Sequence, residues 1–319
     1  IMQKSEFVTG KGKIIQKPEG NEEYYKELID KIMLKKKLKV VVDSSAAIAG
    51  MFVPKLLRIL GCDVIELYSE LNPTNPPHTP DPVAVDAYTE LIKTVIENKA
   101  DVGMVFDGDA DRVGFCDERG RIQLGDVILT ALAQDYLPKY PGEKIIVELK
   151  DSEMVVDEVN RLGGIPIFWK TGHSLLDKKV HEENALLCGE MSCHYWITPN
   201  WYQFDDAVHA MCQMLRILSE NNRTFAEIVD TFPKYYATPE YRIGVPDDIK
   251  FDLVKRVVEY FRPKCTKVLD MDGIRGYTED GWFLFRAANT GPLIVLRIEA
   301  KTPDGLERLK QFVEEGLSN

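Results

Sequence analysis

The fold is decided by the stretch LKVVVDSS, residues 38–45, in which an apolar run predicts a buried strand that ends in a turn of small residues. An amphipathic helix pattern follows and stops at Gly61. The same order returns in KIIVELKDS, residues 144–152, which leads into a second helix pattern that stops at Gly163. A strand, a turn, a helix and a glycine that occur twice in the same order predict two copies of one α/β unit.

Further strands extend both units on either side of these stretches. The first unit continues with apolar runs at 63–67, 102–106 and 113–116, and the second unit with a run at 165–169. Between the first two of these runs lies the segment 69–82, whose five prolines require an extended loop.

The pattern changes after about Tyr236. Short β runs with turns at Asp272-Gly273 and Asp280-Gly281 are closed by a helix from Pro303, which is typical of an α+β domain with an antiparallel sheet. The expected fold class is therefore α/β, with two related α/β domains followed by an α+β C-terminal domain. The expected divisions are a linker or the tail of a missing first domain at 1–20, the two α/β domains at 21–121 and 122–235, and the α+β domain at 236–319.

The composition excludes several classes of function. With 319 residues, of which 45% are hydrophobic, the chain is long enough for two or three cores. Its net charge of -11 argues against nucleic acid as a partner, and no apolar run is long enough to cross a membrane. The six cysteines are scattered without a C-x-x-C pair, which predicts reduced thiols in a cytoplasmic protein.

The strongest chemical signal is the hexapeptide DGDADR, residues 107–112. The carboxylates of Asp107, Asp109 and Asp111 alternate along a loop that follows a strand, and three like charges so close together repel one another without a cation. Such an array offers hard oxygen ligands to Mg²⁺. The sequence therefore predicts a magnesium site with room for a phosphate oxygen of a substrate.

Two other classes of acidic loop share part of this pattern. An EF-hand loop also has alternating carboxylates, and Glu118 falls at its twelfth position, but Arg112 stands where that loop needs glycine. A phosphatase of the haloacid-dehalogenase type also places Asp-x-Asp after an apolar strand, and Asp107 would be its nucleophile. Such enzymes usually continue with a small residue and then Thr or Val, where this chain has Asp111 and Arg112.

Three further loops carry polar side chains at the ends of predicted elements. KTGHS, residues 170–174, opens a helix that suits an anion and contains a histidine able to exchange protons near neutral pH. GEMSCH, residues 189–194, offers groups that can hydrogen-bond sugar hydroxyls, and RAANTGP, residues 286–292, can grip a phosphate. Taken singly, each loop also fits an ordinary turn. The candidate ligands are Lys170, His173, Glu190, Ser192, His194, Arg286, Asn289, Thr290 and, further along, Arg297.

Together the four loops resemble those of the α-D-phosphohexomutase superfamily, in particular its phosphomannomutase/phosphoglucomutase branch. The metal loop of that family is similar to D-G-D-G/A-D-R, its sugar loop to G-E-M-S-G-H and its phosphate loop to R-x-S-N-T-x-P. These motifs and KTGHS occur here in the family's order and over essentially the whole chain. Two positions depart from the pattern: Cys193 replaces a glycine of the sugar loop, and Ala288 replaces a frequent serine of the phosphate loop.

The resemblance implies the reversible transfer of a phosphoryl group between O1 and O6 of a hexose. The transfer would pass through a phosphoserine and a bisphosphate intermediate, with Mg²⁺ as the cofactor and a hexose 1,6-bisphosphate as activator. Met191 in the sugar loop favours mannose and glucose phosphates as substrates. The implied roles are Mg²⁺ binding by Asp107, Asp109 and Asp111, charge neutralisation by Arg112, proton transfer by Lys150 and His173, sugar contacts by Lys170, Glu190, Ser192 and His194, and phosphate contacts by Arg286, Asn289 and Thr290.

The nucleophile of the resembling family is a serine in a T-x-S-H-N-P-type loop, and no serine of this chain lies in that setting. We therefore expect the serine-bearing first domain to be absent from this chain, and the chain alone to be inactive as a mutase. The alternatives are a non-catalytic phosphosugar-binding fragment or pseudoenzyme, and the phosphatase with Asp107 as nucleophile.

Overall fold

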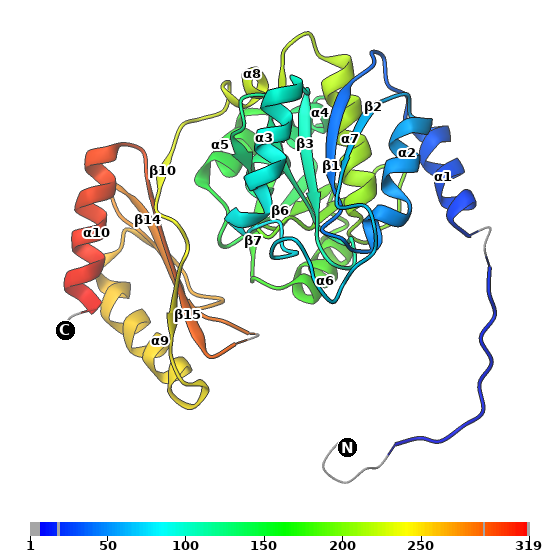
Figure 1. Cartoon of the computed structure of the whole chain (residues 1–319). Coiled ribbons are helices and arrows are strands. Elements are labelled where there is room, and N and C mark those ends of the chain that lie inside the picture. Colours follow the sequence, from blue (N-terminus) through cyan, green and yellow to red (C-terminus); the bar gives the residue numbers. More distant parts are fainter. Residues whose placement is uncertain (1–6, 18–19, 290, 318–319) are drawn as a thin grey trace.

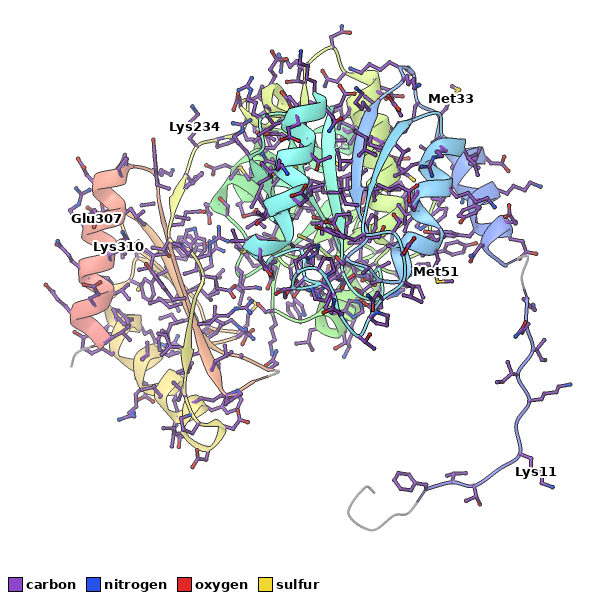
Figure 2. All side chains as sticks on the ribbon, viewed as in Figure 1. Lys11, Met33, Met51, Lys234, Glu307 and Lys310 are labelled. Atoms are coloured by element: carbon purple, nitrogen blue, oxygen red, sulfur yellow. The ribbon has the colours of Figure 1, made fainter. Side chains whose placement is uncertain are left out.

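A computed structural model describes residues 7–17, 20–289 and 291–317 (Figure 1). Residues 7–17 form an exposed, extended segment that leads away from the body of the protein and carries Lys11 (Figure 2). The rest forms an α/β body and a C-terminal domain, and the connection between the two carries Lys234 (Figure 2).

The first sheet is built around the stretch that opens the first repeat. Val40 and Val42 of β1 pack into one hydrophobic core and Val41 packs into another on the opposite face, because helices cover both faces of this mostly parallel sheet. The strand order is β2-β1-β3-β4-β5, with β2 and β3 parallel to β1 and β4 antiparallel to β3. The elements are α1 (Gly20–Lys31), β1 (Lys39–Asp43), α2 (Val53–Ile59), β2 (Asp63–Leu67), α3 (Thr89–Asn98), β3 (Val102–Phe106), β4 (Val113–Asp117) and β5 (Ile122–Gln123).

The second sheet repeats the first. Its order is β7-β6-β8-β9, and again two parallel pairs are followed by one antiparallel pair. The predicted internal repeat is thus confirmed: β6, β7, β8 and β9 correspond to β1, β2, β3 and β4. The elements are α4 (Gly125–Tyr136), β6 (Lys144–Glu148), α5 (Glu153–Arg161), β7 (Ile165–Trp169), α6 (His173–Glu183), β8 (Leu187–Gly189), β9 (Tyr195–Ile197), α7 (Ala207–Glu220) and α8 (Phe225–Val229).

One hydrophobic core runs through both repeats. It includes Tyr25 of α1, Phe106 of β3, Leu129 of α4 and Leu215 of α7. Gly125, at the start of α4, lies so close to the Glu190 carbonyl that a Cβ there would approach its oxygen to 1.9 Å. The two α/β units are therefore packed as one body, and their division at residue 121 stays a prediction.

The C-terminal domain has the expected α+β architecture. Its antiparallel sheet has the order β10-β15-β14-β13-β12, and β11 also pairs with β15. The helices α9 and α10 lie against β14 and β15, and Glu307 and Lys310 of α10 point away from the sheet (Figure 2). The elements are β10 (Tyr236–Ala237), β11 (Tyr241–Gly244), α9 (Asp247–Phe261), β12 (Lys267–Leu269), β13 (Ile274–Tyr277), β14 (Gly281–Ala287), β15 (Leu293–Ala300) and α10 (Pro303–Leu317).

Two helix starts depend on short local segments. Asn21 lies inside α1, which begins at Gly20. A 3-10 turn at Val85–Tyr88 precedes α3, which starts at Thr89. The short 3-10 helices are Ile48–Met51, Val85–Tyr88 and Arg262–Lys264. Within the described residues no helix has both the length and the apolar character that crossing a bilayer needs.

Two arginines of the C-terminal domain join it to the end of β6. They donate hydrogen bonds to three consecutive carbonyl oxygens, those of residues 149–151: Arg275 binds the first and the last at 2.7 and 2.8 Å, and Arg297 binds that of Lys150. The completely buried guanidinium of Arg275 also lies 3.6 Å from the centre of the Trp282 ring. Buried charges are stable only when their hydrogen-bonding capacity is used, and here it is used to hold the two domains together.

We therefore predict that Arg275→Ala lowers the free energy of unfolding by about 3–5 kcal/mol, because it leaves the Glu153 carboxylate, 2.7 Å from Arg275, without its buried partner. Arg308→Ala is the matched control, since this exposed arginine forms its ion pair with Asp280 on the surface, and its loss should change the stability little. Urea unfolding measures both, and equal losses in the two variants would contradict the role given to Arg275.

Candidate active site

The metal loop and the sugar loop occupy equivalent places in the two repeats. The metal loop, residues 107–112, joins β3 to the antiparallel strand β4, and the sugar loop, residues 190–194, joins β8 to β9. The backbone N–H of Val113 donates to the carbonyl oxygen of Cys193 at 3.3 Å, which ties the two loops together. The internal repeat thus places two chemically different loops side by side.

The three carboxylates of the metal loop converge. Asp107, Asp109 and Asp111 each offer an oxygen atom, and these atoms lie within 4.8 Å of one another. The turn requires a left-handed conformation at Ala110, whose φ is 64°. Burial raises the pKa of Asp107 to about 6, although Arg112 acts in the opposite direction. A cation would stabilise the charged form of this buried carboxylate, so the donor set fits a hard divalent metal ion.

Arg112 balances the charge of this loop. Its Nε lies 2.7 Å from an Asp107 oxygen and its Nη1 lies 2.9 Å from an Asp81 oxygen, and Asp111 is 3.8 Å away. Sequence reasoning missed Asp81, which belongs to the proline-rich segment and follows no strand. In this arrangement Arg112 shares Asp107 with the predicted cation.

The sugar loop is a tight turn. The Glu190 N–H donates to the His194 carbonyl oxygen at 3.0 Å, and the Cys193 N–H donates to the Glu190 carbonyl oxygen at 2.8 Å. Cys193 has a φ of 76°, in the left-handed region that glycine adopts without strain but that is unfavourable for a residue with a Cβ atom. This explains why the resembling motif has glycine there. Glu190 is buried, while Ser192 is half-buried.

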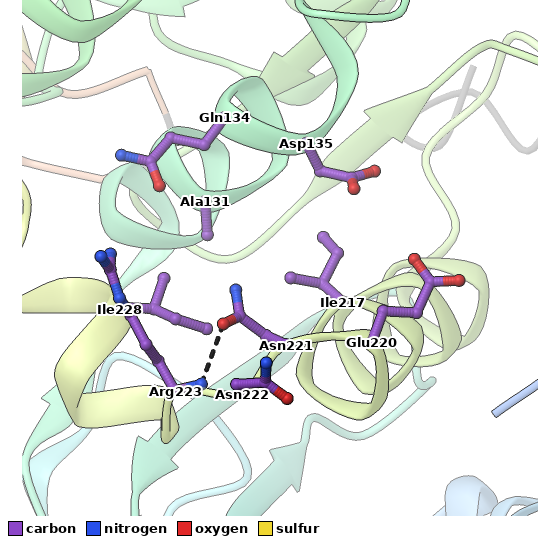
Figure 3. Close-up of a pocket in the computed structure, with 9 residues that line it drawn as sticks. All are labelled: Ala131, Gln134, Asp135, Ile217, Glu220, Asn221, Asn222, Arg223 and Ile228. Atoms are coloured by element: carbon purple, nitrogen blue, oxygen red, sulfur yellow. Dashed lines mark hydrogen bonds between the residues drawn. The ribbon is translucent and has the colours of Figure 1, made fainter. Parts of the chain in front are cut away.

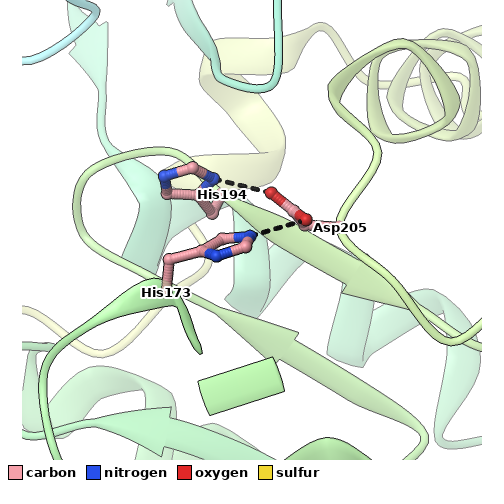
Figure 4. A group of neighbouring side chains, drawn as sticks. All are labelled: His173, His194 and Asp205. Atoms are coloured by element: carbon pink, nitrogen blue, oxygen red, sulfur yellow. Dashed lines mark hydrogen bonds and ion pairs between the residues drawn. The ribbon is translucent and has the colours of Figure 1, made fainter. Parts of the chain in front are cut away.

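The two histidines of the predicted site share one carboxylate (Figure 4). Asp205 lies 2.8 Å from Nε2 of His173 and 2.7 Å from Nδ1 of His194. Burial lowers the pKa of His194, but the hydrogen bond to Asp205 and the charge of Glu190 outweigh it, so this pKa is raised. Asp205 was not predicted, because it comes 11 residues after His194 and belongs to none of the motifs.

Lys150 is buried at the end of β6 between two carboxylates. Its Nζ lies 3.4 Å from Glu148 and 3.6 Å from Glu240 of the C-terminal domain. Burial lowers the pKa of Lys150, but Glu148, Glu240 and Glu190 together raise it above its ordinary value. Glu148 also accepts a hydrogen bond from the Met191 N–H at 2.9 Å, so one carboxylate positions both the lysine and the sugar loop.

The phosphate loop brings an unsatisfied guanidinium to the same region. Arg286 is buried, and its Nε donates to Asp272 at 2.9 Å, but its buried Nη2 has no hydrogen-bond partner among the described residues. The Asn289 side chain donates to the Thr171 carbonyl oxygen at 3.2 Å, and the Thr171 N–H donates to Asp272 at 3.3 Å. The phosphate loop therefore touches the KTGHS loop.

Of the remaining predicted residues, Lys170 and Arg297 lie apart from these contacts. Lys170 is half-buried and has no hydrogen bond or ion pair within the described part of the chain. Thr290 lies outside the described residues. Arg297 was expected to face the phosphate, but its guanidinium contacts the Lys150 carbonyl oxygen and the Met191 sulfur, with Asp126 and Glu299 at 3.6 and 3.7 Å. Arg297 thus contributes to the seam between domains, by which we mean the contacts of Arg275 and Arg297 with residues 149–151. Its phosphate role stays a prediction.

The cavity drawn in Figure 3 is a different place. It has a volume of 580 Å³ and lies between α4, α7 and α8, where Gln134, Asp135 and Arg223 line it. It contains none of the predicted ligands. A smaller hollow of 310 Å³ does reach the site, and Ala110, Asp111 and Asp205 are among the residues that line it.

Comparisons with known proteins match nearly the whole chain. Residues 22–120, 124–236 and 213–316 match, in turn, α/β/α domain II, α/β/α domain III and the C-terminal domain of the phosphoglucomutase/phosphomannomutase family. The chain is 38% identical over 309 residues to a phosphomannomutase/phosphoglucomutase of Pseudomonas aeruginosa, and 33% identical over 317 residues to a phosphoglucomutase of Neisseria meningitidis. In each case 97% of this chain is covered.

A solved structure is similar over nearly the whole chain. It is a phosphoglucomutase/phosphomannomutase family protein from Burkholderia thailandensis, with a TM-score of 0.90, 31% identity and coverage of 99% of this chain. This chain spans 66% of the Pseudomonas protein and 68% of the Neisseria and Burkholderia proteins.

The geometry of the metal loop generates one prediction. Asp109→Asn should weaken Mg²⁺ binding by more than about tenfold, because it removes one of three converging charged oxygens. Asp63→Asn, which changes an exposed aspartate on β2, should leave the affinity unchanged. Calorimetric titration with Mg²⁺ measures both, and unchanged binding in Asn variants of Asp107, Asp109 and Asp111 alike would rule out the metal site.

Proposed function

The chain belongs to the phosphoglucomutase/phosphomannomutase family, and on that premise we propose that it provides the metal, sugar and phosphate loops of a phosphohexomutase. The reaction would be the Mg²⁺-dependent interconversion of hexose 1-phosphate and hexose 6-phosphate. The proposed substrates are mannose and glucose phosphates, in line with the names of the relatives.

One observation carries the proposal. Among the described residues, the buried Nη2 of Arg286 has no hydrogen-bond partner. The carboxylates of Asp107, Asp109 and Asp111 converge in the first α/β unit, and a backbone hydrogen bond joins the end of their loop to the sugar loop. A buried donor without a partner is costly unless a ligand satisfies it. A hexose with a phosphate at each end suits such a site, since one phosphate meets the arginine and the other meets the metal loop.

The three aspartates would hold Mg²⁺, which prefers carboxylate oxygens and keeps positions for water and phosphate oxygens. When bound, the ion would neutralise charge on the phosphoryl group that moves. Arg112 lies against the same loop and would share this task.

Proton transfer is assigned to Lys150, with His173 as the second candidate. Lys150 is buried between Glu148 and Glu240, and these carboxylates hold its pKa above the ordinary value, so it carries both a positive charge and a proton at the end of β6. Glu190, Ser192 and His194 would bind the sugar hydroxyls. Lys170, three residues before His173, is a further candidate for a sugar contact. Arg286 and Asn289, with Thr290, would bind the phosphate that does not react.

The group that accepts the phosphoryl group is proposed to come from a serine-bearing domain of the family that is not among these residues. The serines present do not lie in the family's nucleophile loop. Asp107 is a poor alternative nucleophile, because it is buried and its carboxylate accepts hydrogen bonds from Arg112. A non-catalytic phosphosugar binder is the second candidate function, and turnover distinguishes the two.

The first test concerns the phosphate. Arg286→Ala should weaken binding of mannose 6-phosphate or mannose 1-phosphate by about 1.5–3 kcal/mol, the worth of a hydrogen bond to a charged group, which corresponds to roughly tenfold to a hundredfold. Binding of unphosphorylated mannose should hardly change. Arg256→Ala, at an exposed position of α9 in the same domain, is the control. Equal weakening for phosphorylated and unphosphorylated sugar would refute the phosphate role.

The second test concerns turnover. The 319-residue chain with Mg²⁺ and glucose 1,6-bisphosphate should not convert mannose 1-phosphate to mannose 6-phosphate, because it lacks a phosphoryl acceptor. Adding the family's serine-bearing domain, fused or as a separate chain, should produce conversion, followed by a coupled dehydrogenase assay. Robust turnover by the chain alone would show that the nucleophile lies within it. No turnover after the addition, with binding intact, would favour the non-catalytic binder.

A further inference from the structure

The side chains of His173, His194 and Asp205 form a cluster of possible metal ligands (Figure 4). Two imidazoles from different loops face the two oxygens of one carboxylate, and the possible ligand atoms of all three residues lie within 4.8 Å of one another. His173 begins α6, His194 precedes β9, and Asp205 lies just before α7. Three separate segments of the chain thus converge on one point.

The chemistry of these donors differs from that of the metal loop. Mg²⁺ selects hard oxygen ligands, and the Asp107 loop offers only carboxylates. Imidazole nitrogen together with carboxylate suits Zn²⁺, Co²⁺ and Ni²⁺, and two histidines with one acidic residue are a known ligand set of zinc sites with an open fourth position. The two clusters would therefore select different metal ions.

The surroundings hold the donors in place. The Trp196 ring packs against both imidazoles, with ring centres 5.4 Å from His173 and 6.1 Å from His194, and its Nε1 donates to Asp177 at 3.0 Å. Asp205 forms a backbone bridge with Trp196. Metal sites depend on such outer contacts to orient their ligands.

A metal ion can reach the cluster from solvent, and the ring nitrogen of His194 that does not bind the metal has an acceptor nearby. The His194 and Asp205 side chains are only about one-tenth exposed, but the His173 side chain is 47% exposed, so an ion can reach the cluster from that side. On metal binding each neutral imidazole can carry its proton on the other ring nitrogen. For His194 that nitrogen, Nε2, lies 3.9 Å from a Glu190 oxygen, which is suited to accept the N–H after a small movement.

We propose that His173, His194 and Asp205 form a second metal site, which binds a transition-metal ion such as Zn²⁺ and is distinct from the Asp107–Asp109–Asp111 loop. Zinc–nitrogen distances of about 2.0–2.1 Å place the ligands of a tetrahedral site roughly 3.3 Å apart, so the donors must close from separations of up to 4.8 Å. The exposed side chain of His173 has the most room for this movement, while His194 and Asp205 are held by their buried surroundings. An ion at this place holds the two imidazoles that the proposed function assigns to the substrate.

The test is a calorimetric titration of the 319-residue chain with Zn²⁺ in excess Mg²⁺. We expect one Zn²⁺ per chain, and His173→Ala should weaken its binding by at least about 100-fold, since losing even an outer partner of a metal ligand typically costs 10–100-fold. His181→Ala is the matched control, because His181 is an exposed histidine of the same helix, and its nearest acidic partner in the described part of the chain is Asp177 at 3.9 Å. Asp109→Asn should leave Zn²⁺ binding unchanged.

Co²⁺ provides a second readout, because its visible absorption reports the type and number of ligands. The expected spectrum is that of a site of low coordination number with nitrogen and oxygen ligands, lost in His173→Ala and in His194→Ala. Absence of Zn²⁺ binding, Zn²⁺ binding that survives both histidine substitutions, its loss in Asp109→Asn, or a thiolate charge-transfer band from one of the free cysteines would each overturn the proposal. Since no sugar is present, the result does not depend on the mutase activity.

Discussion

The arrangement of the site depends on how two buried arginines hold the backbone at the end of β6. Arg275 and Arg297 reach from the C-terminal sheet and bind the carbonyl oxygens of residues 149–151. An unpaired guanidinium in this position would be costly, so the two domains are stable together only when these bonds are made. The same contacts fix Lys150 between Glu148 and Glu240 and bring Arg286 to the α/β body.

The second constraint is the repeated topology. Because the two sheets have the same strand order, the loop after β3 and the loop after β8 are equivalent, and a backbone hydrogen bond joins their ends. The loop after β3 carries the carboxylates of Asp107, Asp109 and Asp111, and the loop after β8 carries the groups proposed to bind sugar hydroxyls. The fold thus sets the proposed cation site beside the proposed sugar site, and the C-terminal domain adds the proposed phosphate site.

The sequence allowed much of this to be predicted, and the failures have physical causes. The apolar run before Asp43 and its repeat before Glu148 predicted both α/β units, because a strand buried on both faces has a strong pattern. The helices α4 and α7 were not predicted. In the structure most residues of both helices are buried.

The partners of the site residues were equally hard to predict. The motif loops carry the ligands, but Asp81, Glu148, Asp205 and Asp272 come from segments brought there only by tertiary contacts. Arg297 shows the reverse case. It was a candidate phosphate ligand, but its guanidinium binds the Lys150 carbonyl oxygen where the C-terminal domain meets the end of β6. Motif spacing predicted candidate ligands, but it did not predict the residues that position them.

The central claim is that the metal loop and Arg286 bind the two ends of one phosphorylated hexose. A crystal structure of this chain with Mn²⁺ in place of Mg²⁺ and with glucose 1,6-bisphosphate tests it most directly, since the anomalous signal of Mn²⁺ locates the metal. The account predicts Mn²⁺ at Asp107, Asp109 and Asp111, and one phosphate of the sugar on the free Nη2 of Arg286. A sugar bound elsewhere, or bound with Arg286 contacting only Asp272, would contradict it.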